Sequence, residues 1–206
     1  MGARVVGIGG GSGSGKSTLA HALAARIPGA SIVELDWYYR DLAHLSPPER
    51  AGWNFDHPDA LDWELLREQL GKLTAGEPIA PPLYDFSTHT RLAACRAVAP
   101  AKLVVLEGIL ALHERALREA MDLSIFVAAA EPVRLARRLK RDVCERGRTP
   151  QSVRDQFAAT VRPMHEAFVA PTEAHADLVA DGEGDFAPAI ERALAHLDGL
   201  ARSRSA

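Results

Sequence analysis

The chain has 206 residues, of which 47% are hydrophobic, and a net charge of −3 at pH 7. This length suffices for one sizeable core, and the weak negative charge argues against a surface devoted to nucleic acid or membrane. Cys95 and Cys144 lie far apart without metal-ligand spacing, so we expect buried or half-buried thiols in a reducing compartment. The chain shows no signal-like leader and no long apolar run, which predicts a cytoplasmic protein with no membrane partner.

Short apolar runs alternate with helix-period segments along the chain. We expect strands at residues 4–8, 31–35, 102–108, 122–129 and 176–180, and helices at 16–27, 61–73, 131–146, 150–169 and 186–201. This alternation predicts an α/β fold with a doubly wound parallel sheet of about five strands, flanked by helices on both faces. Ligands of such sheets bind at the carboxyl ends of the strands. We expect one domain over residues 1–201 and a disordered tail over 202–206.

The most informative motif is GGGSGSGKST, residues 9–18, between the first predicted strand and the first predicted helix. Its spacing is that of a phosphate-binding loop, in which backbone N–H groups cradle phosphates. Lys16 would reach the terminal phosphates, and Ser17 could ligate Mg²⁺. The residues expected to contact ATP are Gly10, Gly11, Ser12, Gly13, Ser14, Gly15, Lys16, Ser17 and Thr18. The alternative is a merely flexible glycine loop.

Three classes of protein could use such a loop. A GTPase should carry an N-K-x-D motif, which is absent, and the D-x-x-G match at residues 181–184 follows the last strand. A nucleic-acid ATPase should have more chain and a larger basic surface. A small-molecule kinase needs an acid near the acceptor hydroxyl, a pocket for the acceptor, and arginines that cover the phosphates.

Two acids follow predicted strands. Asp36 comes at the end of the second strand, which we expect to lie next to the first, so its carboxylate could accept a proton from an attacking hydroxyl or help to hold Mg²⁺. The alternative is a helix-capping role. Glu107 ends the run LVVLE and could hold the metal through water, or could simply be solvated.

The segment 131–149 is a candidate lid over the phosphates. Periodicity places Leu135, Leu139 and Val143 on one face of a helix, and Arg134, Arg138 and Arg141 on another. Arginine binds phosphate through a planar fork and keeps its charge when water is excluded. The alternative is an ordinary solvated charged face.

The excursion, residues 44–91, is a candidate nucleoside-binding region. Asp56, beside Phe55, could bind sugar hydroxyls, while Tyr84, Phe86 and His89 could stack on a base and read its edge. Each has a structural alternative. In the same region, Asp59 or Asp62 could cap the helix near residue 63, and Trp53 and Trp63 are expected to pack.

Taken together, these segments resemble the uridine/cytidine kinase family, relatives of phosphoribulokinase among the phosphate-loop kinases. The resemblance runs from about residue 4 to 180, through GSGSGKST, DWYYRDL, NFDHPDALD, YDFSTHTR, LEGIL, RRLKRDVCERGR and VRPMHEAFVAPTEAHADLV. It implies ATP- and Mg²⁺-dependent phosphorylation of the ribose 5′-hydroxyl of uridine or cytidine in pyrimidine salvage. Members often form tetramers, which this sequence neither shows nor excludes.

The resemblance also implies roles for individual residues. Asp36 would be the general base, and Lys16, Arg141 and Arg146 would act on the transferring phosphates, with Ser17 and Glu107 at the metal. The residues expected around the nucleoside are Tyr39 as a wall, Asp56 and Arg138 at the ribose hydroxyls, and Tyr84, His89, Arg148 and Gln156 at the base, with Phe86 packing against it.

The sequence departs from the family after the last strand. Members usually carry a Pro-Arg-Gly stretch where this chain has ADGEGDF, with Asp185 near the place of an ATP contact, so recognition of the donor base is open. Two alternatives remain: a kinase of another hydroxyl, similar to phosphoribulokinase or pantothenate kinase, or a switch that keeps the loop but transfers no phosphate.

Overall fold

The computed structural model describes residues 2–203, and the side chains of residues 2–200. Five parallel strands form the central sheet in the order β2-β5-β1-β6-β7. Their bounds are β1 Arg4–Gly10, β2 Ala30–Glu34, β5 Leu103–Glu107, β6 Leu123–Ala128 and β7 Leu178–Asp181. All five residues of β5 are buried, as expected for a strand covered on both faces. The predicted five-stranded parallel sheet is therefore confirmed.

The strand order corrects one expectation. β5 lies between β1 and β2, so the second strand is not next to the first. Both neighbours of β5 are in register with it, since Ile8 of β1 and Glu34 of β2 both pair with Glu107. The phosphate loop after β1 and the turn after β2 consequently flank the end of β5, with Glu107 between them.

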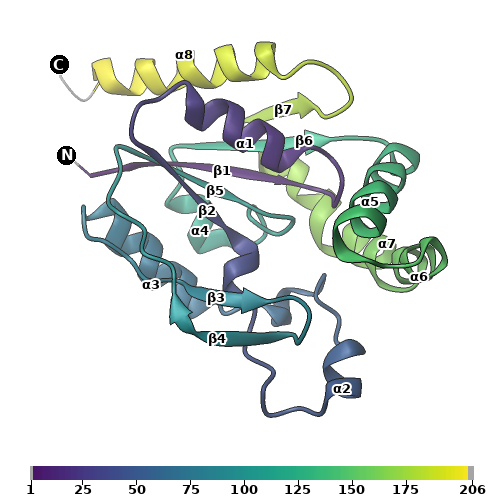
Figure 1. Ribbon diagram of the computed structural model, residues 1–206. Helices are drawn as coiled ribbons and strands as arrows, with labels where there is room; N and C mark the ends of the chain where they lie inside the picture. Colours follow the sequence, from purple (N-terminus) through teal and green to yellow (C-terminus); the bar gives the residue numbers. More distant parts are fainter. Residues whose placement is uncertain (1, 204–206) are drawn as a thin grey trace.

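Helices cover both faces of the sheet (Figure 1). On one face α1 (Lys16–Ala25) and α8 (Ala187–Ser203) pack through Leu19, Leu23 and Ile190 onto the strands. On the other face lie α3 (Trp63–Thr74) and the short α4 (Arg115–Glu119), with the 3₁₀ helix Ala170–His175, which contacts β1 and β6. Because α8 continues to Ser203, it includes two residues of the segment expected to be a disordered tail; residues 204–206 lie outside the described part of the chain.

The excursion folds as several short elements beside the sheet. After β2 come the 3₁₀ turn Leu35–Tyr38, α2 (Pro47–Ala51) and the 3₁₀ turn Pro58–Ala60. Asp62 caps α3 by accepting a hydrogen bond from the Leu65 N–H at 3.2 Å, which decides between the two proposed caps. An antiparallel hairpin of β3 (Pro82–Asp85) and β4 (Thr90–Cys95) follows, and the sequence did not predict it.

The expectation of buried or half-buried thiols is wrong for both cysteines. Cys95 and Cys144 are free and exposed. Cys95 ends β4, whose last four residues are all exposed, and β4 pairs only with β3 among the described residues. Cys144 lies on the solvent side of the lid helix.

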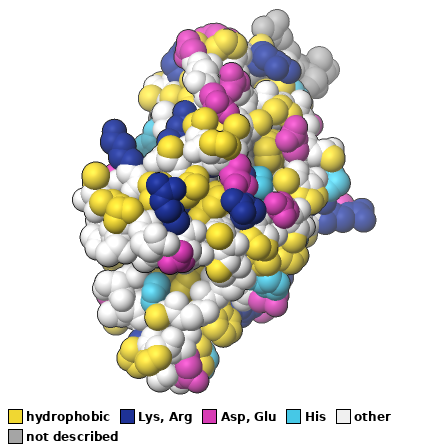
Figure 2. Space-filling view, turned by 90° about the vertical axis from the view of Figure 1, so that its right-hand side faces the viewer, with side chains coloured by type: hydrophobic (Ala, Val, Ile, Leu, Met, Phe, Trp, Pro, Cys, Tyr) yellow, Lys and Arg dark blue, Asp and Glu magenta, His cyan; other side chains and the backbone are white. Residues whose placement is uncertain are grey.

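The lid segment forms α5 (Glu131–Arg146), which ends at Gly147 in the left-handed conformation. α6 (Pro150–Gln156) continues through the π-helical stretches Phe157–Val161 and His165–Val169 and the short α7 (Arg162–Met164), so the helix predicted over 150–169 is present but irregular. Figure 2 views this side of the molecule, where Lys and Arg side chains are interspersed with acidic and apolar ones. None of the helices within residues 2–203 has the length and apolar character that crossing a membrane requires.

Candidate active site

The phosphate loop joins β1 directly to α1. Gly10, Gly13 and Gly15 have positive φ values of 137°, 81° and 105°, which an L side chain rarely adopts. Gly13 is also needed for a close approach, since a Cβ atom there would lie 2.4 Å from the carbonyl oxygen of Arg134 on the lid helix. The loop therefore presents its backbone N–H groups at the start of α1 while touching the lid segment.

Lys16 and Ser17 begin α1 on the side of the two predicted acids. Lys16 donates from Nζ to the carbonyl oxygen of Gly11 at 3.1 Å, and burial lowers the pKa of Lys16 while Glu107 and Asp36 oppose that shift. Ser17 Oγ donates to Glu107 Oε1 at 2.9 Å. Glu107 is buried, not solvated as in the alternative, and that burial raises its pKa.

Asp36 lies inside the 3₁₀ turn that follows β2. The N-cap of that turn is Glu34, so Asp36 is not the helix cap that was the alternative. Its carboxylate lines the same cavity as Lys16, Ser17 and Glu107. Although β5 separates β2 from β1, the turn after β2 places Asp36 in the same cavity as the phosphate-loop residue Lys16.

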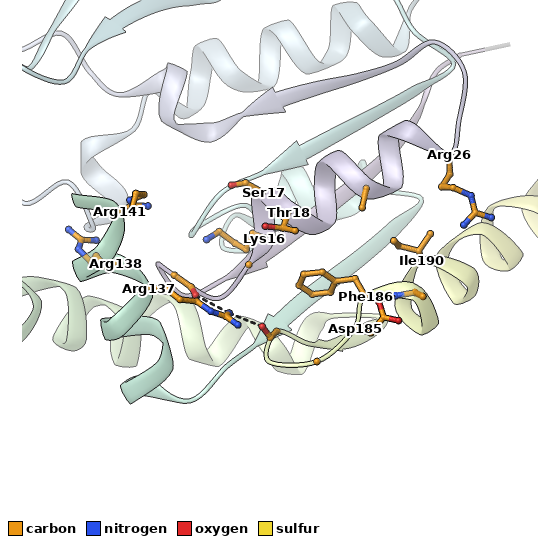
Figure 3. A pocket seen from close by; sticks show the side chains of 16 residues that line it. Lys16, Ser17, Thr18, Arg26, Arg137, Arg138, Arg141, Asp185, Phe186 and Ile190 are labelled. Carbon is orange, nitrogen blue, oxygen red and sulfur yellow. Dashed lines mark hydrogen bonds between the residues drawn. The ribbon is translucent and has the colours of Figure 1, made fainter. Parts of the chain in front are cut away.

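A first cavity of about 750 Å³, the loop-side cavity, lies between the phosphate loop, α1 and the start of α8. Figure 3 shows Phe186 and Ile190 facing α1 across it, with Lys16, Ser17 and Thr18 at one end and Arg26 at the other. An apolar wall next to a phosphate cradle suits a nucleotide whose base lies between the two helices.

Asp185 lines the loop-side cavity, and its Oδ1 accepts the N–H of Ala187 at 2.9 Å at the start of α8. Sequence reasoning missed Phe186, which follows it, and Arg137. Arg137 Nη1 donates to the carbonyl oxygens of Gly182 at 2.7 Å and Ser14 at 3.3 Å, and thereby ties the divergent 182–185 segment to the phosphate loop (Figure 3). Arg137 is one of several arginines in the lid segment, and the periodicity of the sequence does not distinguish it from the others.

A second cavity of about 670 Å³, the hairpin-side cavity, is bounded by the hairpin, the lid segment and the phosphate loop. It brings together every residue that the family resemblance placed around the nucleoside: Tyr39, Asp56, Tyr84, Phe86, His89, Arg138, Arg148 and Gln156. The predicted catalytic residues Asp36, Lys16, Arg141 and Arg146 line it as well. Ile109, after β5, is a lining residue that the sequence did not indicate.

The aromatic side of this cavity is a packed set of rings. The Tyr39 ring lies 5.3 Å from Phe55 and 5.4 Å from Tyr84, and Phe55 stacks on His89 at 4.7 Å. His89 has a φ of 57°, unusual outside glycine, and burial lowers its pKa, which favours the uncharged imidazole. Phe86 is 47% exposed, and the Arg146 guanidinium lies over its ring at 5.7 Å.

The polar side of the cavity centres on Asp56 and Arg138, both nearly buried. Burial raises the pKa of Asp56, and Arg138 opposes the shift. Arg138 donates from Nη1 to Ser12 Oγ at 2.9 Å and from Nη2 to Gln156 Oε1 at 3.0 Å. Because Arg134 and Arg138 are only 4% and 7% exposed, the solvated-face alternative for the lid segment is wrong for these two residues.

The two cavities meet at the phosphate loop. Lys16, Ser17, Arg138 and Arg141 line both of them. A phosphate loop that separates one cavity with an apolar wall from a second cavity with an acid at its base is the arrangement of a phosphate-loop phosphotransferase. Residues 5–185 match the model of the Phosphoribulokinase / Uridine kinase family, and the chain belongs to that family.

Individual relatives agree with this assignment. A uridine kinase from Chloroflexus aggregans is 42% identical to this chain over 97% of it and 96% of the relative. A uridine kinase from Deinococcus deserti is 46% identical over 94% of both chains. Among solved structures, phosphoribulokinase from Rhodobacter spheroides has a TM-score of 0.63 at 16% identity, covering 90% of this chain and 74% of that one, and shows the common fold.

Proposed function

We propose that the protein transfers the γ-phosphoryl group of ATP to the 5′-hydroxyl of uridine, cytidine or both. The observation that carries the proposal is the shared wall of the hairpin-side cavity: Asp36, Lys16 and Ser17 line the same space as the nucleoside-binding candidates. The names of the relatives support uridine as the acceptor. The hairpin contributes aromatic rings to this space, which suits a neutral nucleoside better than a sugar that already bears phosphate.

In this proposal Asp36 accepts the proton of the 5′-hydroxyl as its oxygen attacks the γ-phosphorus. The new O–P bond forms as the bond between the γ-phosphorus and the oxygen bridging it to the β-phosphorus breaks, and ADP leaves. Lys16, Arg141 and Arg146 face the phosphoryl oxygens and balance the charge that develops on them. Lys16 is buried at the phosphate loop, whereas the Arg141 and Arg146 side chains are 35% and 42% exposed at the open side of the cavity, where they can reach a bound phosphate.

Mg²⁺ is part of the proposal, and the donor atoms fit it. Ser17 Oγ and Glu107 Oε1, 2.9 Å apart, are hydroxyl and carboxylate oxygens, the kinds of donor that this cation prefers, and they would hold it. Among the described residues no group of three or more His, Cys, Asp or Glu is arranged to hold a metal. Bound there, the ion would neutralise charge on the β- and γ-phosphates.

The remaining roles are those that the family resemblance implies, and the two cavities support them. Asp56 and Arg138 would bind the ribose hydroxyls; Tyr84, His89, Arg148 and Gln156 would bind the base, with Tyr39 and Phe86 packing around it. Asp185 would lie on the donor side. We further propose that residues 1–201 act as one kinase domain, and that the protein is a cytoplasmic homo-oligomer without nucleic-acid or membrane partners; sedimentation measurements test the assembly.

A coupled assay of ADP release tests the function. Uridine, cytidine, adenosine, ribulose 5-phosphate and pantothenate are offered separately with Mg-ATP. We expect turnover with uridine, cytidine or both, and a loss of about 10²- to 10⁴-fold in kcat for Asp36→Asn, because a general base contributes that much, while ATP binding is retained. Turnover with ribulose 5-phosphate or pantothenate instead would assign another acceptor, and full activity of Asp36→Asn would rule out its role as base.

A further inference from the structure

The lid segment gathers four arginines around one carboxylate that the sequence did not single out. Arg138, Arg141, Arg146 and Arg148 all line the hairpin-side cavity. Asp142 lies behind them on α5 and is fully buried. Burying a carboxylate costs free energy of desolvation, which nearby positive charges can offset. The position of Asp142 among the arginines therefore needs a physical explanation.

The path of the chain creates this cluster. α5 ends at Gly147, whose φ of 63° turns the backbone into the left-handed conformation. The Arg148 N–H then donates to the Asp142 carbonyl oxygen at 3.1 Å. This turn folds Arg148 back beside a residue of the last helical turns, so that arginines before and after Asp142 converge on its side chain.

Most of the contacts with Asp142 are electrostatic and only one is a short hydrogen bond. Arg141 Nε donates to Oδ1 at 2.8 Å. By contrast, Arg138 Nε lies 3.4 Å from Oδ2, Arg146 Nη1 lies 3.7 Å from Oδ1, and Arg148 Nη1 lies 3.6 Å from Oδ2. Oδ2 is buried and has no hydrogen-bond partner among the described residues. The carboxylate therefore holds these guanidinium groups by charge, without using many of their N–H donors.

We propose that Asp142 is a positioning residue: it keeps the four arginines together and balances part of their charge, while leaving the terminal N–H donors of Arg141 and Arg146 for the phosphoryl oxygens of the substrates. Without it, several positive charges would face one another across a few ångströms. The cavity would then relax by spreading the arginines or by capturing an anion. The consequence for catalysis depends on the kinase function proposed above, whereas the charge balance does not.

The test uses Asp142→Asn, which keeps the shape of the side chain and an oxygen for Arg141 but removes the charge. Isothermal titration with sodium sulfate, at constant ionic strength and without nucleotide, measures how strongly the arginine cluster binds an anion. Since one nearby negative charge is lost, we expect the variant to bind sulfate about tenfold more tightly than the unaltered protein. Asp155→Asn, an exposed acid on α6, removes the same charge away from the cluster and should leave sulfate binding unchanged.

A second variant separates charge balance from a general loss of structure. Asp142→Asn with Arg146→Gln restores the original net charge at a partly exposed arginine, and its sulfate affinity should return to that of the unaltered protein. If Asp142→Asn is unfolded in plain buffer, sulfate should restore its thermal transition, because an anion that binds the folded state stabilises it. Unchanged sulfate affinity in a folded Asp142→Asn, or an unfolded variant that sulfate does not rescue, would overturn the proposal.

Activity supplies the independent readout. We expect kcat of Asp142→Asn for nucleoside phosphorylation to fall about 10- to 100-fold with a smaller change in KM for the nucleoside, because misplaced arginines weaken contacts to the transferring phosphoryl group. An unchanged kcat would contradict the positioning role. If no nucleoside is phosphorylated by the unaltered protein, the proposed function fails, and the sulfate titration still decides the inference about Asp142.

Discussion

The close approach of the divergent 182–185 segment to the phosphate loop makes Gly182 a sharp test of how the donor site is built. A Cβ atom at Gly182 would lie 2.3 Å from the Ser14 carbonyl oxygen and 2.8 Å from that of Ala128. Both are backbone atoms, and the first belongs to the phosphate loop itself. Gly182→Ala must therefore push the segment away from the loop.

The size of the effect follows from the contacts that this shift would stretch. The Gly182 N–H donates to the Ala128 carbonyl oxygen at 2.7 Å, and Arg137 Nη1 donates to the Gly182 carbonyl oxygen at 2.7 Å. One neutral hydrogen bond and one charge-assisted hydrogen bond, the latter discounted for exposure, contribute about 1–3 kcal/mol together, which corresponds to about a 5- to 150-fold rise in KM for ATP. KM for the nucleoside should change little, because the segment does not line the hairpin-side cavity.

Steady-state kinetics with each substrate varied in turn measure this difference. Gly199→Ala, on α8, is the matched control, because a Cβ atom there would meet nothing within 4 Å and the residue lines neither cavity. Its KM values should remain within about threefold of the unaltered protein, the range of ordinary surface changes. An unchanged KM for ATP in Gly182→Ala, or equal effects in the two variants, would refute the view that this segment positions the donor.

Three further predictions concern ionisable groups. Glu107→Gln should raise the Mg²⁺ concentration for half-maximal activity about 10- to 100-fold, as loss of a supporting carboxylate commonly does, and a Mg²⁺ titration at fixed ATP checks it; an unchanged midpoint would remove Glu107 from the metal site. Because burial raises the pKa of Asp56, KM for uridine should begin to rise at a pH above the usual carboxylate range as pH falls, and the profile should flatten in Asp56→Asn; parallel profiles would contradict the ribose-binding role. Burial lowers the pKa of His165 from 6.5 to about 4, so the unfolded chain binds a proton at this residue more tightly than the folded protein does. The free energy of unfolding is therefore highest above pH 6.5 and falls by up to about 3 kcal/mol as the pH drops toward 4. Urea unfolding of His165→Gln should show less of this slope, and an identical slope would show that other groups cause it.

Local patterns were enough to predict the sheet and the phosphate loop. β1 and β5 are runs of apolar residues, and the glycines of residues 9–15 need conformations that few other residues allow, so both signals are carried by adjacent residues. The strand order is different in kind. Placing β5 between β1 and β2 depends on packing between segments about 70 residues apart, and nothing in the letters around Asp36 indicates it.

The hairpin shows where periodicity fails. β3 begins at Pro82, and β4 ends in exposed small residues, so neither has the alternation of a half-buried strand. The family resemblance nevertheless predicted that Tyr84 and His89 lie at the nucleoside site, and both line the hairpin-side cavity. A resemblance in motifs carries information about site residues that the alternation of apolar residues does not.

The sequence did not indicate Arg137 and Asp142, because a helix rich in charged residues does not show which of them face the cavities and which face solvent. The lid helix reads as a polar surface, yet Arg134, Arg138 and Asp142 are buried and the apolar Leu135 and Leu139 are only half-buried. The polar stripe faces inward because it borders cavities that must accommodate phosphate, and the usual link between hydrophobicity and burial is reversed there.

The separation of the hairpin from the central sheet has a consequence for how such enzymes can diversify. Within residues 2–203, β3 and β4 pair only with each other, whereas Glu107 ends a strand of the five-stranded sheet, and the phosphate loop and the turn bearing Asp36 directly follow two of its other strands. Substitutions in residues 82–95 other than Arg91, whose guanidinium donates to the Tyr39 carbonyl oxygen next to the turn bearing Asp36, can therefore reshape the aromatic wall around an acceptor while leaving the chemistry of phosphoryl transfer intact. For protein engineering, this makes the hairpin the natural segment to randomise when selecting for phosphorylation of altered nucleosides.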